Sequence, residues 1–485
     1  MARPFGDRWG RGAMLDNFLS IRRLGALLTA VPRSGAIAFA ACLAMAGAAL
    51  GASSLISPSA VQAQSAGATL RGHQGVASCA GSTCHGRSAA DGTVVRQDEL
   101  MRWQEDSSPT GAHSRAWRVI QEPRGQAIVR RMGLDAAGVQ RECAGCHSSP
   151  GAARVSDGVD CEACHGASSG WLSTHYTVGA SHARNVAQGM TDLTRPQVKA
   201  QVCLDCHFSG DAKGQFIAHR IMAAGHPRIS FEMDLFTTLQ QHHDEDADYV
   251  QRKGGKTNGM RMWAVGQAEA VKRSLELFSQ PARAVDGIFP EFTFYDCHSC
   301  HRRIYDGEDG NVTAVPNPGR PVHLGMPPYN DENMIMLLAA ARVVAPDAAT
   351  AFDAKSKAFH RAMAANRAET VAAAQELRQS ADQLSSRFAS ASFTRDQTFA
   401  IMDSIASEAI GERFTDYEGA VQSVMAVDTL LNGLVNQGMV APSSAGNLRI
   451  QINQAYAAVR DPNGFQPLAF RKALGSAVRS IRSLR

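Results

Sequence analysis

The sequence predicts a mainly α protein in two parts: short helices and loops over residues 64–328, then an all-α helical bundle over residues 329–485. The first part is rich in Gly, His, Arg and Pro and shows little periodicity, which favours short elements over long ones. In the second part glycine becomes rare, alanine becomes common, and apolar residues recur at helical spacing. These contrasts predict the fold class.

Ten cysteines of the first part form five motifs in which a histidine directly follows the second cysteine. The first motif in the chain is a longer C-x4-C-H, formed by Cys79, Cys84 and His85. The second to fifth motifs are C-x-x-C-H: Cys143, Cys146 and His147; Cys161, Cys164 and His165; Cys203, Cys206 and His207; Cys297, Cys300 and His301. In such motifs both thiols attach covalently to a haem and the histidine ligates its iron.

We therefore expect five covalently attached c-type haems, with the short helices and loops wrapped around a stack of them. The proximal iron ligands are then His85, His147, His165, His207 and His301. The porphyrins would supply apolar core that side chains otherwise provide. An isolated C-x4-C pair is more often structural or a disulfide. The interpretation of the first motif as a haem-attachment site therefore depends on the presence of the other four motifs in the same chain.

The bundle is predicted from apolar stripes such as Tyr417, Val421 and Val424. We expect three to five antiparallel helices without a haem, with residues 442–446 as a loop. Docking or dimerisation is one role for this bundle, and covering the last haem is another. The sequence leaves the oligomeric state open.

Residues 1–63 are predicted to be a signal peptide. Arg22, Arg23 and Arg33 precede an apolar stretch, and Ala63 ends a cleavage-like run of small residues, so Gln64 begins the mature chain. The alternative is an uncleaved anchor, because residues 34–56 are long enough to span a bilayer. The predicted location is the bacterial periplasm, with membrane association only through an uncleaved N-terminus or a partner.

The remaining residues carry 43 basic and 43 acidic side chains and contain no basic tract, which argues against nucleic acid as a partner. The expected partners are periplasmic or membrane-bound redox proteins.

The ligand on the second face of each iron decides between electron transfer and substrate chemistry. Eleven of the 16 histidines lie outside the proximal positions. The distal candidates are His113, His175, His219, His226 and His323, with His182 in reserve. His242 and His243 precede acidic residues and are interpreted as a solvated polar loop. The pairing of distal ligands with haems stays open.

The run from Gly158 to Gly166, followed by Trp171 and His175, resembles the cytochrome c-552/4 type multihaem family, which includes the tetrahaem electron carrier of ammonia oxidisers. The resemblance covers about residues 75–230. It implies closely stacked haem pairs, mostly with two histidine ligands, in a periplasmic electron-transfer chain. The Cys297 motif and the bundle lie outside the family pattern, and the C-x-x-C-K motif of ammonia-forming nitrite reductases is absent.

The first functional hypothesis is a periplasmic pentahaem cytochrome that transfers electrons between redox partners in a respiratory chain. The alternative is a multihaem oxidoreductase in which one open haem acts on a small nitrogen or sulfur compound. His182, Arg184 and Arg228 could then polarise the substrate, although contact with haem propionates would explain them equally well. A haem-sensing or assembly role is a third hypothesis. No catalytic residue is assigned, and the sequence favours a carrier over an enzyme.

Overall fold

The computed structural model describes residues 72–89, 96–152, 154–228, 230–253, 255–284, 289–301, 319–323, 325–409 and 417–485. The predicted signal peptide and its cleavage site lie outside these residues. Residues 72–485 form one compact unit. In its described part there is no β-strand, only an isolated antiparallel bridge between Tyr295 and Tyr329. The prediction of a mainly α fold is therefore confirmed.

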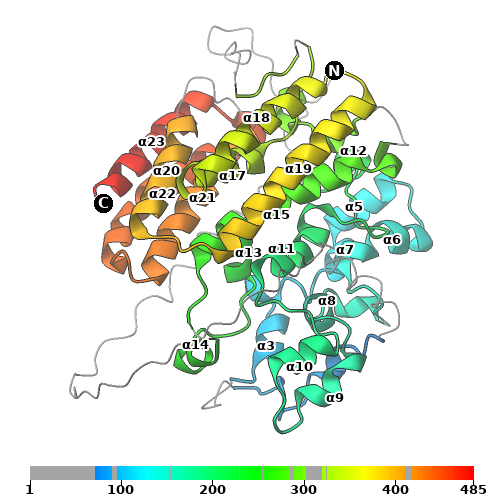
Figure 1. Ribbon diagram of the computed structural model, residues 1–485. Coiled ribbons are helices and arrows are strands. Elements are labelled where there is room, and N and C mark those ends of the chain that lie inside the picture. Colours follow the sequence, from blue (N-terminus) through cyan, green and yellow to red (C-terminus); the bar gives the residue numbers. More distant parts are fainter. Residues whose placement is uncertain are drawn as a thin grey trace, which may run out of the picture. The chain divides into compact units, whose positions relative to one another are not determined.

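Short helices and loops make up the chain as far as residue 253 (Figure 1). These helices are α3 (Glu99–Gln104), α4 (Arg118–Gln121), α5 (Pro123–Arg131), α6 (Ala136–Glu142), α7 (Ala144–His147), α8 (Cys161–His165), α9 (Leu172–His175), α10 (His182–Ala187), α11 (Pro196–Leu204), α12 (His219–Ala223), α13 (Met233–Leu239) and α14 (Ala247–Lys253). A π-helical turn (Asp205–Ser209) follows α11, and α16 (Cys297–Cys300) carries the last motif.

The long helices are α15 (Gly259–Ser279), α17 (Glu332–Val344), α18 (Pro346–Ala362), α19 (Arg367–Ser390), α20 (Arg395–Ala409), α21 (Tyr417–Asn436), α22 (Pro442–Ala458) and α23 (Pro467–Arg482). Seven of them follow residue 331 in the described chain, so the expectation of three to five was too low. Residues 442–446, expected as a loop, open α22 instead. Proline is tolerated at the first position of a helix because that backbone nitrogen needs no intrahelical partner. Pro442 therefore begins a helix here, as Pro346 and Pro467 do.

Helix α15 joins the two predicted parts. It packs against α17, α19 and α21 of the bundle and against α11 of the motif-rich part (Figure 1). A side chain at Gly266 would come within 2.5 Å of Met233, so glycine allows α13 to lie close to α15. Helix α15 lies before the predicted boundary at residue 328, yet it is surrounded by bundle helices. The division into two domains at that residue stays a prediction.

The apolar core is unevenly distributed along the chain. One large buried cluster extends over α15 and the helices that follow, with Trp263 and Phe352 fully buried. Among the described residues from 72 to 199, by contrast, the buried apolar side chains are those of Ile120, Val139 and Trp171. So few buried side chains cannot hold more than a hundred residues together. The motif-rich part needs another source of apolar surface.

Among the described residues, no helix combines the length and the apolar character needed to cross a membrane.

Candidate haem centres

Three of the C-x-x-C-H motifs lie on the short helices α7, α8 and α16, and the Cys203 motif spans the end of α11 and the π-helical turn that follows it. In the second and fifth motifs the histidine amide donates to the carbonyl of the first cysteine, at 3.1 Å for His147 and 2.8 Å for His301. Residues three apart on a helix share one face, so the two thiols of a C-x-x-C-H motif on a helical turn point to the same side. Acidic side chains fix two of the turns: Asp160 caps α8 through the amide of Glu162, and Asp296 caps α16.

The longer first motif has the same hydrogen bond between its histidine amide and the carbonyl of its first cysteine. The amide of His85 lies 3.2 Å from the carbonyl oxygen of Cys79, the bond seen in the standard motifs. The two extra residues are taken up by a turn in which Cys84 donates to the carbonyl of Gly81 at 2.8 Å. A side chain at Gly86 would collide with the carbonyl of Ala80, so the glycine after His85 lets the turn close. This geometry supports attachment over a purely structural role for the two cysteines.

All ten motif cysteines are free of disulfide bonds. The thiols of different motifs adjoin: Cys79 is hydrogen-bonded to Cys161, and Cys146 to Cys206. The hydrogen bond from Cys161 lowers the pKa of Cys79 to about 6, whereas burial raises the pKa of Cys164 to about 11. The first motif therefore lies beside the third, and the second beside the fourth.

Each proximal histidine faces a second histidine from elsewhere in the chain. The ring centres are 6.1 Å apart for His85 and His175, 6.2 Å for His147 and His226, 6.4 Å for His165 and His242, 6.0 Å for His207 and His113, and 6.0 Å for His301 and His219. Each of the five predicted attachment sites therefore has one pair of facing histidines.

This spacing fits an iron between the rings. Imidazole nitrogens bind first-row metals at about 2 Å, so two such nitrogens lie about 4 Å apart and the ring centres farther still. Rings in direct contact are closer, as His242 and His243 are at 4.3 Å. The residues present therefore fit a haem at each of the five pairs.

Hydrogen bonds orient several of these rings through Nδ1, which leaves Nε2 free for a metal. Nδ1 lies 3.0 Å from Glu99 Oε2 in His85, and 2.6 Å from the Ala116 carbonyl in His147. In the distal set, Nδ1 of His226 lies 2.8 Å from the carbonyl of Pro227.

Burial keeps three of the paired imidazoles, His165, His207 and His242, in the neutral form that ligates iron. It lowers the pKa of His165 and of His207 to about 3, and the pKa of His242 to about 4. Desolvation penalises the charged ring in each case, and the neighbouring His242 adds to the effect at His165. All three rings are neutral at pH 7.

The pairs correct the interpretation of His242 and His243 as a solvated loop. His242 is half-buried against His165, and acidic residues anchor the segment. Both terminal nitrogens of Arg102 donate to Asp244 at 2.8 Å, and Arg96 Nε donates to Asp246 at 3.0 Å. The acids that suggested solvent exposure are partners of arginines on and beside α3. The adjacent pair of histidines was the only signal in the sequence, and nothing local distinguished it from a surface loop.

His323, expected as a distal ligand, is exposed, and in the described part of the chain no histidine ring lies against it. His182, the reserve, pairs with Asp192 at 3.0 Å. Arg184 is exposed on α10. Arg228 donates to Glu332 at 3.0 Å and lies 3.1 Å from Cys297 Sγ.

A hollow of about 600 Å³ lies beside the first motif, which is the size of a cofactor pocket. Leu100 and Trp103 line its apolar side, and Arg115, Arg118 and Arg154 add guanidinium groups. These arginines pair with Asp106 and Asp157, which line the same hollow.

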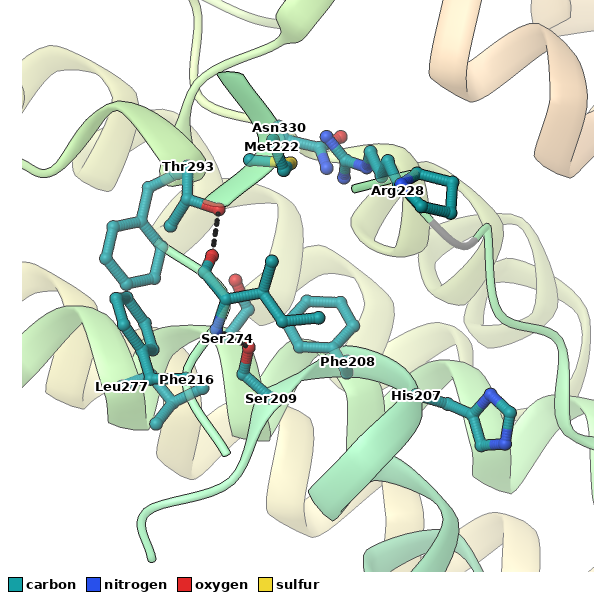
Figure 2. Close-up of a pocket in the computed structure, with 13 residues that line it drawn as sticks. His207, Phe208, Ser209, Phe216, Met222, Arg228, Ser274, Leu277, Thr293 and Asn330 are labelled. Atoms are coloured by element: carbon teal, nitrogen blue, oxygen red, sulfur yellow. Dashed lines mark hydrogen bonds between the residues drawn. The ribbon is translucent and has the colours of Figure 1, made fainter. Parts of the chain in front are cut away.

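A smaller cavity of about 60 Å³ separates His207 from Arg228 (Figure 2). The hydroxyl of Thr293 closes one side by donating to the carbonyl of Ile217 at 3.0 Å. It has room for little more than a few waters.

Helical fold, attachment turns and paired histidines together define a c-type cytochrome. Residues 78–166 match the model of the family described as cytochrome c554 and c-prime, and the match includes the first three attachment motifs. This match supports covalently attached c-type haem in the matched segment, as in multihaem c-type cytochromes. No curated protein and no solved structure matches the chain.

Proposed function

We propose that this protein is an exported pentahaem cytochrome that carries electrons between redox partners. The observation that carries the proposal is that all five proximal histidines face a second histidine. An iron with two imidazole ligands has no position left for a substrate, which suits electron transfer. A haem held at such a pair supplies a one-electron iron couple.

The proposed distal ligands are His113, His175, His219, His226 and His242. Each comes from outside the motif that it serves, so every site ties two segments of the chain together. Helix α12 and the residue three positions beyond its end supply two of them, His219 for the fifth motif and His226 for the second. The adjoining thiols link the first site to the third and the second to the fourth, and the charge interaction between Cys164 and Cys206 links the third to the fourth. Together these links favour one continuous row of sites.

An enzyme with an open haem has less support. The three residues that could assist such chemistry are occupied elsewhere or exposed: His182 bonds Asp192, Arg228 bonds Glu332, and Arg184 lies on the surface. Of these three residues, Arg228 lies beside an attachment cysteine, Cys297, and there it is paired with Glu332.

The predicted leader supports export to the periplasm. Electron donors and acceptors in that compartment, soluble or membrane-bound, are the partners that we propose.

Haem content and spin state test this function. The purified protein should give five haems per chain by pyridine haemochrome and by intact mass. Electron paramagnetic resonance of the oxidised form should show low-spin iron only, and carbon monoxide should leave the reduced spectrum unchanged. Four haems would refute the first attachment site. A high-spin signal that binds carbon monoxide would favour the oxidoreductase instead.

A further inference from the structure

A buried carboxylate lies against the proximal histidine of the first motif. Glu99 is the first residue of α3 and is 7 % exposed. Its Oε2 lies 3.0 Å from His85 Nδ1, the ring nitrogen that faces away from the iron position. A carboxylate in this place accepts a hydrogen bond from the imidazole N–H and makes the ring a stronger electron donor to the metal.

The same carboxylate reaches the third site. Glu99 Oε1 lies 3.5 Å from Nδ1 of His243, and the His243 ring packs against His242 with the ring centres 4.3 Å apart and the planes tilted by 42°. His242 is the ring that faces His165. One side chain thus contacts the proximal histidine of the first site and supports the distal histidine of the third.

Each oxygen of the Glu99 carboxylate faces one imidazole nitrogen: Oε2 faces that of His85, and Oε1 faces that of His243. Because Glu99 is buried on the first turn of α3, the carboxylate is held in place against the ring of His85.

The other proximal histidines have different surroundings in the described structure. His147 Nδ1 bonds the neutral carbonyl of Ala116, and the buried Nδ1 of His207 has no hydrogen-bond partner. Among the described residues, no carboxylate contacts the ring of His165 or His301. The carboxylate contact is thus a feature of the first site.

We propose that Glu99 is a positioning residue that gives the first haem the most negative reduction potential of the five. This inference rests on the proposed attachment of a haem at Cys79 and Cys84. A negative charge on the far side of the ligand stabilises ferric over ferrous iron, so the haem is harder to reduce. Electrons that enter at this end of the row would then run downhill toward the other sites.

Substitution of Glu99→Gln keeps the shape and removes the charge. Changes beyond a metal's direct ligands commonly alter its properties about tenfold. We expect about a tenfold increase in the reduction equilibrium constant of one haem, about 59 mV for a one-electron couple. The measurement is a redox titration followed by visible and paramagnetic resonance spectra. The matched control is Glu105→Gln, at the exposed C-terminal end of the same helix, which should leave all five potentials unchanged.

Glu99→Asp retains the charge and should shift the potential less than Glu99→Gln does, which separates charge from packing. Five attached haems in Glu99→Gln, all with parent potentials, would overturn the proposal. A uniform shift of all five would also overturn it. If the parent itself carries no haem at Cys79 and Cys84, the proposed function fails at that site, and haem counting on the parent identifies this case.

Discussion

At the scale of single residues, the haem sites depend on which histidines meet. Proximal histidines follow from the motif itself, since the attachment chemistry requires a histidine next to the second cysteine. His113, His175, His219 and His226 were candidates because they stand beside helix starts, turns or aromatic residues, and each lies opposite a proximal ring. His242 was missed because its placement depends on arginines about 140 residues away in sequence. Long-range contacts of this kind leave no local pattern.

Replacement of His242 should open one iron. In His242→Ala the third site loses the ring that faces His165, and water or an added ligand can take its place. We expect one haem in five to become high-spin and to bind carbon monoxide when reduced, with the haem count unchanged because the thioethers remain. His323→Ala is the matched control and should match the parent spectrum. If His323→Ala produced the high-spin haem and His242→Ala did not, the distal ligand would be His323 and not His242.

The ring planes predict a resonance fingerprint. Parallel imidazoles split the iron d orbitals strongly and give a three-line rhombic signal, whereas perpendicular rings leave two orbitals nearly equal and give one steep low-field feature. The planes are 21° apart for His85 and His175 and 28° for His301 and His219. They are 85° apart for His147 and His226 and 87° for His165 and His242.

Low-temperature spectra should therefore contain two signals of the rhombic kind and two of the steep kind. The fifth pair, His207 and His113, is intermediate at 64°. Five superimposable rhombic signals would contradict the ring orientations.

At the scale of elements, ion pairs and aromatic contacts fasten the last attachment turn to the bundle. The ring of His298 in α16 lies 5.7 Å from Tyr417 and 5.5 Å from Phe465. Arg228 bridges Cys297 Sγ and Glu332 at the start of α17. The expectation that the bundle covers the last haem gains support from these contacts. Docking and dimerisation are not tested by them.

Loss of the bridge should weaken this junction. In Arg228→Met the carboxylate of Glu332, 3 % exposed, loses its cationic partner. Removing the cation from this buried carboxylate should cost about 2 kcal/mol of unfolding free energy, less than breaking a fully buried pair because Arg228 itself is partly exposed. Denaturant unfolding measures this cost. Arg220→Ala breaks the exposed pair with Glu142 and should cost at most about 1 kcal/mol. Equal losses of unfolding free energy in the two variants would show that the buried Arg228 pair stabilises the protein no more than the exposed Arg220 pair does.

At the scale of the whole molecule, composition separates a part of short helices and loops from a part of long helices packed on one another. The change in glycine and alanine content near residue 329 predicted this contrast correctly in kind. It could not place α15, because a helix of 21 residues before the boundary carries no mark of the partners that will bury it. The expected number of bundle helices was also too low. Proline commonly ends a helix, but here it begins three of the bundle helices.

The chain without haem should fold in one part only. Residues 72–199 bury three apolar side chains in the described structure, whereas α15 and the bundle share one large apolar cluster. Removing the porphyrins removes the apolar surface around which the first segment is ordered, and small cores of this kind do not persist alone. We expect protein produced without the haem-attachment machinery to be cut by protease within residues 72–230 and to retain a resistant fragment from about residue 255 onward. Holoprotein should resist cleavage in both regions, and mass spectrometry of the fragments locates the cuts. Equal protection of residues 72–230 with and without haem would mean that hydrogen bonds and ion pairs alone hold the attachment turns in place.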